Sequence, residues 1–289
     1  MRQLVVNGDD FGLTPGINAG MIDAHRDGVL TSVSLMAGAP AVDEALTLAR
    51  ATPTLGVGCH LTLVDGAPVL PVSQLPTLTV DGRFHPTWGS FMAAGLSGRL
   101  ALPEVERELA AQIDRVRSGG VTPTHLDSHK HVHLWPPVFD IVARLAARFG
   151  IAVVRVPYER PAAGLALRHL AQPGARRQAM ENVLMAPWAR RAGRLLARHG
   201  LPPAPRFTGR AITGLWSVPA LAPLLRRLPE GRSELMAHPG YPDAALDAMR
   251  TRLRAARADE IAVLRAPAVR EMLRAEGIVL VPHGATAAV

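Results

Sequence analysis

Strand-like and helix-like segments alternate along most of the 289 residues, and this alternation restricts the chain to a small number of folds. Apolar, β-branched runs predict strands near 3–8, 31–37, 55–63, 123–128, 152–157, 211–215, 233–237 and 278–282. Amphipathic segments predict helices near 15–27, 41–51, 103–118, 136–149, 218–228, 243–265 and 267–276. Such alternation is typical of right-handed βαβ units. We therefore expect an α/β protein, a distorted (β/α) TIM-like barrel with parallel strands, formed as a single domain by residues 1–289.

Two segments interrupt the alternation. Residues 65–102 are rich in proline and glycine without a clear period, and residues 160–210 are rich in arginine. Both follow predicted strands, so we expect them to be insertions at the carboxyl-end face of the barrel, where βα loops shape substrate choice.

Charge is concentrated in the second insertion. The formal net charge of the chain is +8, while residues 160–210 hold ten arginines and one acid, Glu181, so the rest is near neutral. One local basic surface with few aromatic residues argues against a nucleic-acid binder. A helix over 181–199 would place arginines opposite an apolar face made of Leu184, Met185, Trp188, Ala192, Leu195 and Leu196. This pattern fits a helix packed on its own barrel or an interfacial helix on an anionic membrane.

The cellular location is predicted from three weaker signals. Cys59 is the sole cysteine, so an internal disulfide is impossible and a reducing compartment fits. No signal peptide is apparent, and no apolar run is long enough to span a bilayer. We expect a cytoplasmic protein. The predicted helix over 181–199 also allows peripheral contact with the inner face of the membrane.

Two adjacent carboxylates, Asp9 and Asp10, end the first predicted strand. Thr14 and Pro15 follow as an N-cap and a first-turn residue of a helix, so the acids lie at the carboxyl end of the strand. Like charges this close seldom coexist unless a cation or a shared proton relieves them. The pair therefore indicates either a metal ligand beside a base or, alternatively, helix capping.

Two histidines complete a plausible divalent-metal site. His60 ends one predicted strand, and alternation along another places His125, Asp127 and His129 on one face. One carboxylate and two imidazoles, Asp10 with His60 and His129, form a suitable donor set. His133 is a rival third ligand because it follows His129 at ligand-like spacing.

Further polar residues follow other predicted strands. Arg155 could hold a catalytic carboxylate ionised or be a surface arginine, and His238 could donate a proton or serve packing. Cys59 neighbours His60 and should face away from the site, which argues against a cysteine nucleophile. We expect substrate contacts from His131, His133, Tyr158 and Asp127.

The chain resembles the YdjC-like (ChbG-type) carbohydrate deacetylases. The resemblance covers nearly the whole chain and is carried by Val6-Asn7-Gly8-Asp9-Asp10-Phe11-Gly12, Gly58-Cys59-His60-Leu61, His125-Leu126-Asp127-Ser128-His129, His238-Pro239-Gly240 and the run 259–270. With 63–71 after the first histidine, it looks closest to the hopanoid-biosynthesis-associated HpnK branch. Gly8 departs from the alanine usual in the family, which removes no functional group.

The resemblance implies a distorted barrel that removes N-acetyl groups from sugars. One divalent metal, Zn²⁺ or Mg²⁺, would be held by Asp10, His60 and His129, and Asp9 would be the general base. Arg155 would orient that base and His238 would be the acid. It further implies an N-acetylglucosaminyl hopanoid lipid as the substrate and makes a homodimer reasonable. The nitrogen-rich donor set favours zinc, because magnesium prefers oxygen ligands.

Three other functions remain open from the sequence. The same chemistry could act on a soluble chito-oligosaccharide such as diacetylchitobiose. Phosphoester hydrolysis often uses two metals, whereas these ligands suffice for one. A non-catalytic sugar-binding or assembly protein is the third, although a binder need not keep a base beside a metal.

Overall fold

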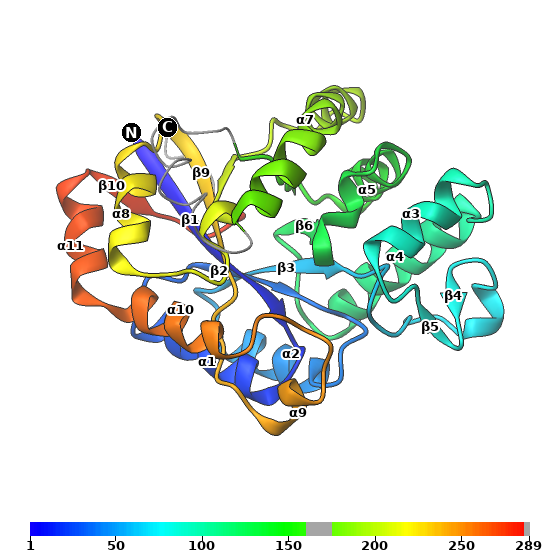
Figure 1. Ribbon diagram of the computed structural model, residues 1–289, viewed down its shortest axis with the longest axis horizontal. Coiled ribbons are helices and arrows are strands. Elements are labelled where there is room, and N and C mark those ends of the chain that lie inside the picture. Colours follow the sequence, from blue (N-terminus) through cyan, green and yellow to red (C-terminus); the bar gives the residue numbers. More distant parts are fainter. Residues whose placement is uncertain (160–174, 286–289) are drawn as a thin grey trace.

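The computed structural model describes residues 1–159 and 175–285. Parallel strands form one sheet in the order β7–β6–β3–β2–β1–β9–β8, and β10 pairs with the start of β1 (Figure 1). The strands are β1 Arg2–Phe11, β2 Ser32–Leu35, β3 Gly56–Leu61, β6 His125–Ser128, β7 Val153–Val154, β8 Arg206–Thr208, β9 Gly231–Ala237 and β10 Ile278–Leu280. Among the described residues no pairing joins β7 to β8, so the sheet curls into a half-barrel. The predicted α/β class and distorted barrel are confirmed.

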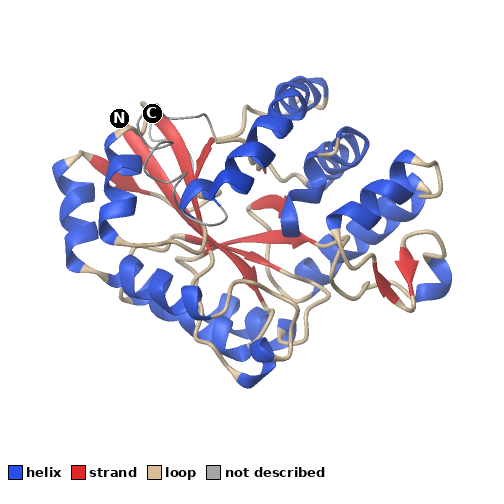
Figure 2. Cartoon of the chain, viewed as in Figure 1, coloured by secondary structure: helices blue, strands red, loops and turns tan. Residues whose placement is uncertain are grey.

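Helices surround this sheet on the outside (Figure 2). Their bounds are α1 Pro15–Arg26, α2 Val42–Ala51, α4 Leu102–Ser118, α5 Pro136–Phe149, α7 Ala175–Arg198, α8 Val218–Arg226, α9 Ala244–Asp247, α10 Ala255–Arg265 and α11 Pro267–Ala275. As predicted, the Thr14 hydroxyl accepts a hydrogen bond from Ile17 N at the start of α1, and Pro15 fills its first turn. Gly150 ends α5 in the left-handed conformation, with φ of 70°.

The two faces of β1 show how the core is divided. Leu4 and Val6 join the hydrophobic core. Asn7 and Asp9 lie on the opposite, inner face and are hydrogen-bonded to each other at 2.9 Å. Where TIM barrels fill this interior mainly with branched apolar side chains, this one contains a buried polar network that supports the site.

Two secondary-structure predictions were wrong. The strand expected at 211–215 is instead β8 at Arg206–Thr208, because Gly209 (φ 102°) breaks the strand and the turn η3 Arg210–Ile212 follows. The helix expected over 243–265 is split into α9 and α10. No elements were predicted within residues 65–102, which contain the turn η1 Val72–Gln74, the hairpin β4 Thr79–Val80 with β5 Arg83–Phe84, and α3 Trp88–Leu96. These elements are too short for a periodic signal.

The arginine-rich insertion contains α7, which packs on α5. Ala192, Leu195 and Leu196 are buried in the core, and Trp188 lies against Trp88 with ring centroids 6.2 Å apart. This half of the helix fits the prediction of a helix packed on its own barrel. The earlier half differs, since Met180, Val183 and Leu184 are all at least 60% exposed. No helix in the described part of the chain is long and apolar enough to cross a membrane.

Candidate metal and catalytic site

An irregularity in β1 brings both neighbouring carboxylates to the site. The register between β1 and β2 shifts between Gly8 and Phe11, and Asp10 has a left-handed φ of 77°. In a regular strand, adjacent side chains point to opposite faces. The irregularity instead leaves Asp9 and Asp10 both buried at the end of the strand, and Gly12 N donates to Asn18 Oδ1 at 2.7 Å just beyond it.

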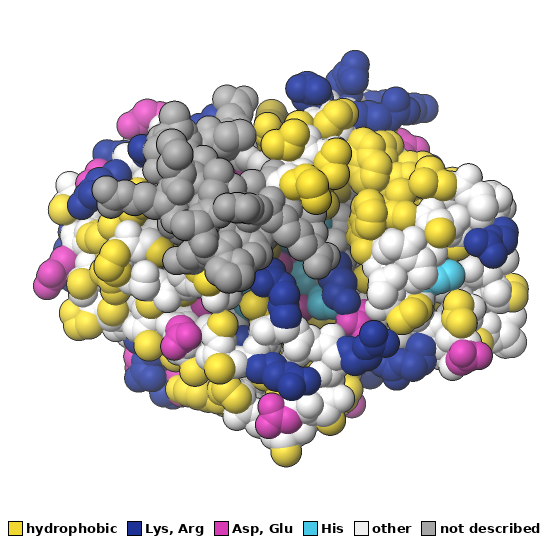
Figure 3. Space-filling view, viewed as in Figure 1, with side chains coloured by type: hydrophobic (Ala, Val, Ile, Leu, Met, Phe, Trp, Pro, Cys, Tyr) yellow, Lys and Arg dark blue, Asp and Glu magenta, His cyan; other side chains and the backbone are white. Residues whose placement is uncertain are grey.

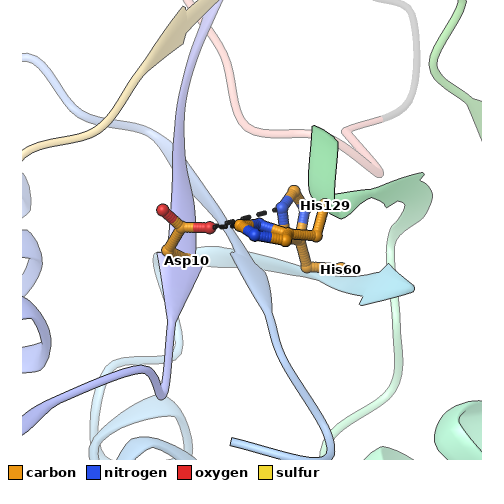
Figure 4. A group of neighbouring side chains, drawn as sticks. All are labelled: Asp10, His60 and His129. Carbon is orange, nitrogen blue, oxygen red and sulfur yellow. Dashed lines mark hydrogen bonds and ion pairs between the residues drawn. The ribbon is translucent and has the colours of Figure 1, made fainter. Parts of the chain in front are cut away.

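Asp10, His60 and His129 converge as predicted, from β1, from β3 and from the first residue after β6 (Figure 4). Asp10 Oδ1 lies 3.0 Å from His129 Nδ1 and 3.5 Å from His60 Nε2. One ligand atom from each residue lies within 4.8 Å of the others. Two imidazole nitrogens and one carboxylate oxygen in this space fit a divalent cation, and the donor types suit Zn²⁺ better than Mg²⁺.

Each buried ligand is oriented by a charged partner. Asp127 Oδ1 lies 2.8 Å from His60 Nδ1, which directs the other ring nitrogen of His60 toward Asp10. Arg257 donates to Asp10 Oδ2 at 2.6 Å. Burial would raise the pKa of Asp10, but Arg257, His129 and His60 hold it well below its usual range. Burial would lower the pKa of His60, but the carboxylates of Asp127, Asp10 and Asp9 raise it to about 10. The same negative charge would attract a cation.

Asp9 lies outside the cluster of Asp10, His60 and His129, and it forms a second group of possible ligands with His60 and Asp127. Arg155 donates to both of its oxygens at 2.7 Å, and Asn7 donates to Oδ1. Burial raises the pKa of Asp9, with a contribution from Asp127, against the lowering effect of Arg155. A carboxylate with a raised pKa is better suited to accept a proton near neutral pH.

Arg155 lies at the centre of the buried network and not at the surface. Its guanidinium is 1% exposed and also contacts Asp127 Oδ2 at 2.7 Å and Glu234 Oε1 at 2.6 Å. The carboxylates of Asp9, Asp127 and Glu234 thus all contact one guanidinium group, and these contacts offset the cost of burying its charge. The structure thus places Arg155 directly against Asp9, the carboxylate that it was predicted to hold.

The remaining predicted histidines differ in environment. Burial is the main cause that lowers the pKa of His238 to about 3, and Arg257, His60 and Arg155 contribute. Burial, Arg210 and Arg155 hold the pKa of His131 well below its usual range. Both side chains are therefore neutral imidazoles at neutral pH, and Nδ1 of each is buried without a hydrogen-bond partner among the described residues.

Two residues do not fit their predicted substrate contacts. Asp127 is fully buried behind His60, and its oxygens are taken by His60, Arg155 and Ser34. His133 is also fully buried: its Nδ1 lies 2.5 Å from Ser128 Oγ, and its Nε2 lies 2.9 Å from the Arg155 carbonyl oxygen. With both ring nitrogens engaged, His133 does not fit the role of a rival ligand either.

Tyr158 is half-buried in the chain that follows β7, and its substrate contact stays a prediction. Cys59 is buried in the hydrophobic core, as expected from its alternation with His60, and burial raises the pKa of its thiol. Figure 3 shows histidine side chains in a hollow near the centre of one face, with Lys and Arg side chains beside it.

Sequence reasoning missed several charged partners of the site. Glu234 contacts Arg155, and Arg257 and Glu260 reach the site from α10. The sequence offered one signal: Arg257, Glu260, Ile261 and Leu264 follow helical spacing, so two charges lie on an otherwise apolar face. Their partners at the site are 19 to 247 residues away in sequence, which no local pattern reveals.

Comparisons with known proteins agree with this architecture. The chain is 32% identical over 287 residues to a carbohydrate deacetylase of Geobacillus stearothermophilus, covering 98% of this chain and 97% of that protein. It is 47% identical over 153 residues to a chitooligosaccharide deacetylase of Salmonella typhimurium, covering 53% and 58%. A crystal structure of a putative cellobiose-phosphate cleavage protein from Enterococcus faecalis superposes with a TM-score of 0.75 at 26% identity, covering 98% and 97%.

The family assignment follows from these likenesses together with a family-wide match. The family model described as YdjC-like protein matches residues 3–275, which include every strand except β10 and all the residues of the site. The chain belongs to the YdjC-like protein family.

Proposed function

We propose that this chain is a metal-dependent carbohydrate deacetylase, a hydrolase that removes the N-acetyl group from an amino sugar. The observation that carries this proposal is the cluster of Asp10, His60 and His129 beside Asp9, a carboxylate whose two oxygens both accept hydrogen bonds from Arg155. The two relatives named as deacetylases support the same reaction class.

Asp10, His60 and His129 would hold the cation. When bound, it would acidify a water molecule and polarise the acetamide carbonyl group. Asp9 accepts the proton of the attacking water, and Arg155 keeps the Asp9 carboxylate in place during the transfer.

The departing amine needs a proton, and His238 is the proposed relay. Ala237, the residue before it, pairs with Gly8, the residue before Asp9, so the two side chains lie at neighbouring strand ends. The proton that Asp9 takes from water balances the proton that the amine nitrogen gains as the C–N bond breaks, and His238 is the side chain proposed to carry a proton to that nitrogen. His131 and Tyr158 remain the proposed substrate contacts.

Two substrate classes are supported by different observations. A soluble chito-oligosaccharide is favoured by the name of the Salmonella relative. A lipid-linked amino sugar, such as an N-acetylglucosaminyl hopanoid used in the cytoplasm at the inner face of the membrane, is favoured by the exposed Met180, Val183 and Leu184 on α7.

The test is acetate release from N,N′-diacetylchitobiose and from an N-acetylglucosaminyl hopanoid, with metal-stripped and Zn²⁺-reloaded protein and with D9N as the control. We expect release that depends on the metal and on Asp9. Release from the lipid alone would select the hopanoid, and release from the sugar alone would select the chito-oligosaccharide. No release from either by folded, zinc-bound protein would refute the proposal.

A further inference from the structure

Helix α10 directs two buried ionisable side chains toward the site. Arg257 is 1% exposed and Glu260 is fully buried, and their spacing of three residues places them on the same face of the helix. Burying a charge is unfavourable unless it is paired and hydrogen-bonded. The contacts of these two residues therefore indicate what they do.

Arg257 binds one carboxylate oxygen of Asp10 and leaves the other facing the two histidines. Its Nη2 donates to Asp10 Oδ2 at 2.6 Å, while Asp10 Oδ1 faces His60 and His129. Its Nε donates to the Leu253 carbonyl at 3.0 Å, which anchors the guanidinium on its own helix. Asp10 is thus held so that a single oxygen is presented to the two histidines.

The same helix holds the main chain of His238. Pairing of β9 with β1 ends at Ala237, so the peptide groups of His238 have no partner in the sheet. Arg257 Nη1 donates to the His238 carbonyl oxygen at 3.4 Å, and His238 N donates to Glu260 Oε2. Both main-chain groups of His238 are therefore fixed by α10.

We propose that Arg257 and Glu260 are positioning residues that set the ligand Asp10 and the proton relay His238 in one geometry. This inference rests on the proposed function for the role of His238, but the half that concerns Asp10 is testable by cation binding alone. Arg257 keeps Asp10 a one-oxygen ligand, and Glu260 fixes the direction in which His238 leaves the sheet.

The first test compares R257Q, R257K and R265Q, with Co²⁺ as the probe. Arg265 lies on the same helix in an exposed ion pair with Asp27, so R265Q is the matched control. In R257Q, Asp10 gains a second free oxygen and loses a neighbouring positive charge. We expect undiminished Co²⁺ affinity, an altered Co²⁺ absorption spectrum, and kcat lower by roughly 10- to 100-fold.

R257K keeps the positive charge and should recover part of kcat. An ammonium group cannot hold Asp10 and His238 together, so R257K should still alter the Co²⁺ spectrum and can replace R257Q in this test if R257Q does not fold. An unchanged Co²⁺ spectrum and kcat in both variants would overturn the role of Arg257. If wild-type protein releases no acetate while R257Q still alters the spectrum, the proposed function fails and the role at Asp10 stands.

The second test addresses His238. E260L removes the acceptor for His238 N, so we expect kcat to fall roughly tenfold or more while Co²⁺ affinity and KM stay near wild type. E260Q keeps an acceptor oxygen and should recover part of that loss. Equal kcat for wild type, E260L and E260Q would overturn the role of Glu260.

Discussion

Asp9 and Asp10 are neighbours in sequence, yet their surroundings give them different chemistry. Burial leaves Asp9 with a raised pKa despite the opposing effect of Arg155, while Arg257 and two histidines keep Asp10 ionised against the effect of burial. Their surroundings, not their residue type, therefore distinguish the proposed base from the proposed metal ligand.

This difference predicts the behaviour of D9N. We expect kcat for acetate release to fall by roughly 10²- to 10⁴-fold, because the amide cannot accept the proton. Zinc binding, measured by calorimetry, should be retained because Asp10, His60 and His129 are intact. D10N is the matched control and should lose zinc affinity. Loss of zinc in D9N as well would contradict the division of roles.

Glu260 predicts a pH dependence of stability. Burial raises its pKa to about 8 from the model-peptide value of 4.5. Between these pH values the folded protein retains a proton that the unfolded chain has released, so this group makes stability fall as pH rises. We expect E260Q to match wild type near pH 4 and to be more stable near pH 8, on the order of 3 kcal/mol, by urea denaturation. A difference independent of pH would contradict the assignment.

At the scale of elements, α1 is shaped to receive the turn that carries His238. A Cβ at Gly20 would lie 2.8 Å from Gly240 Cα and 2.9 Å from Tyr241 N, so the helix and the turn approach backbone to backbone. Gly16 contributes in the same way, because its carbonyl oxygen accepts a hydrogen bond from Tyr241 N at 3.0 Å. The position of His238 therefore depends on Gly16 and Gly20 of α1, where a side chain would push the turn away from the helix.

G20A and G193A form a matched pair. Alanine has the higher helix propensity, so at Gly193 of α7, where a Cβ meets nothing within 4 Å, we expect about 0.5–1 kcal/mol of added stability. At Gly20 we expect a loss of about 1–3 kcal/mol, because the turn must move. Thermal denaturation measures both, and a stabilised G20A with full activity would show that the close approach is unimportant.

Helices and strands were predicted well where their hydrophobic periodicity continued over enough residues to be detected. The paired carboxylates, His60 and His129 were found because each lies at or beside the end of a predicted strand, and such ends meet in a parallel barrel. The irregularity at Asp10 was not predicted, since positive φ at a non-glycine residue depends on tertiary contacts. For the same reason, the sequence did not predict the contact of Arg257 with Asp10 or the hydrogen bonds that occupy both ring nitrogens of His133.

At the scale of the whole molecule, the cation site joins three separate strand ends. β1, β3 and β6 contribute one ligand each, in or just beyond the strand, so binding would link segments that are far apart in sequence. A cation that binds the folded state alone stabilises it by about 2.7 kcal/mol at a concentration 100 times its Kd.

Metal-stripped protein should therefore melt at a lower temperature than zinc-loaded protein. D10N should show little of this shift, whereas R265Q should show all of it. Equal melting temperatures for stripped and loaded wild type, in a sample shown to contain zinc, would argue against a site formed by these three strands.

The left-handed backbone at Asp10 also governs how this site can be probed. Asparagine tolerates positive φ nearly as well as aspartate, whereas alanine does not. D10N therefore removes a charge and leaves the chain path intact. D10A removes the charge and strains the turn that leads into α1, so its defect would mix lost coordination with a displaced helix. Alanine scanning would overstate the chemical importance of this position, and an amide scan would not.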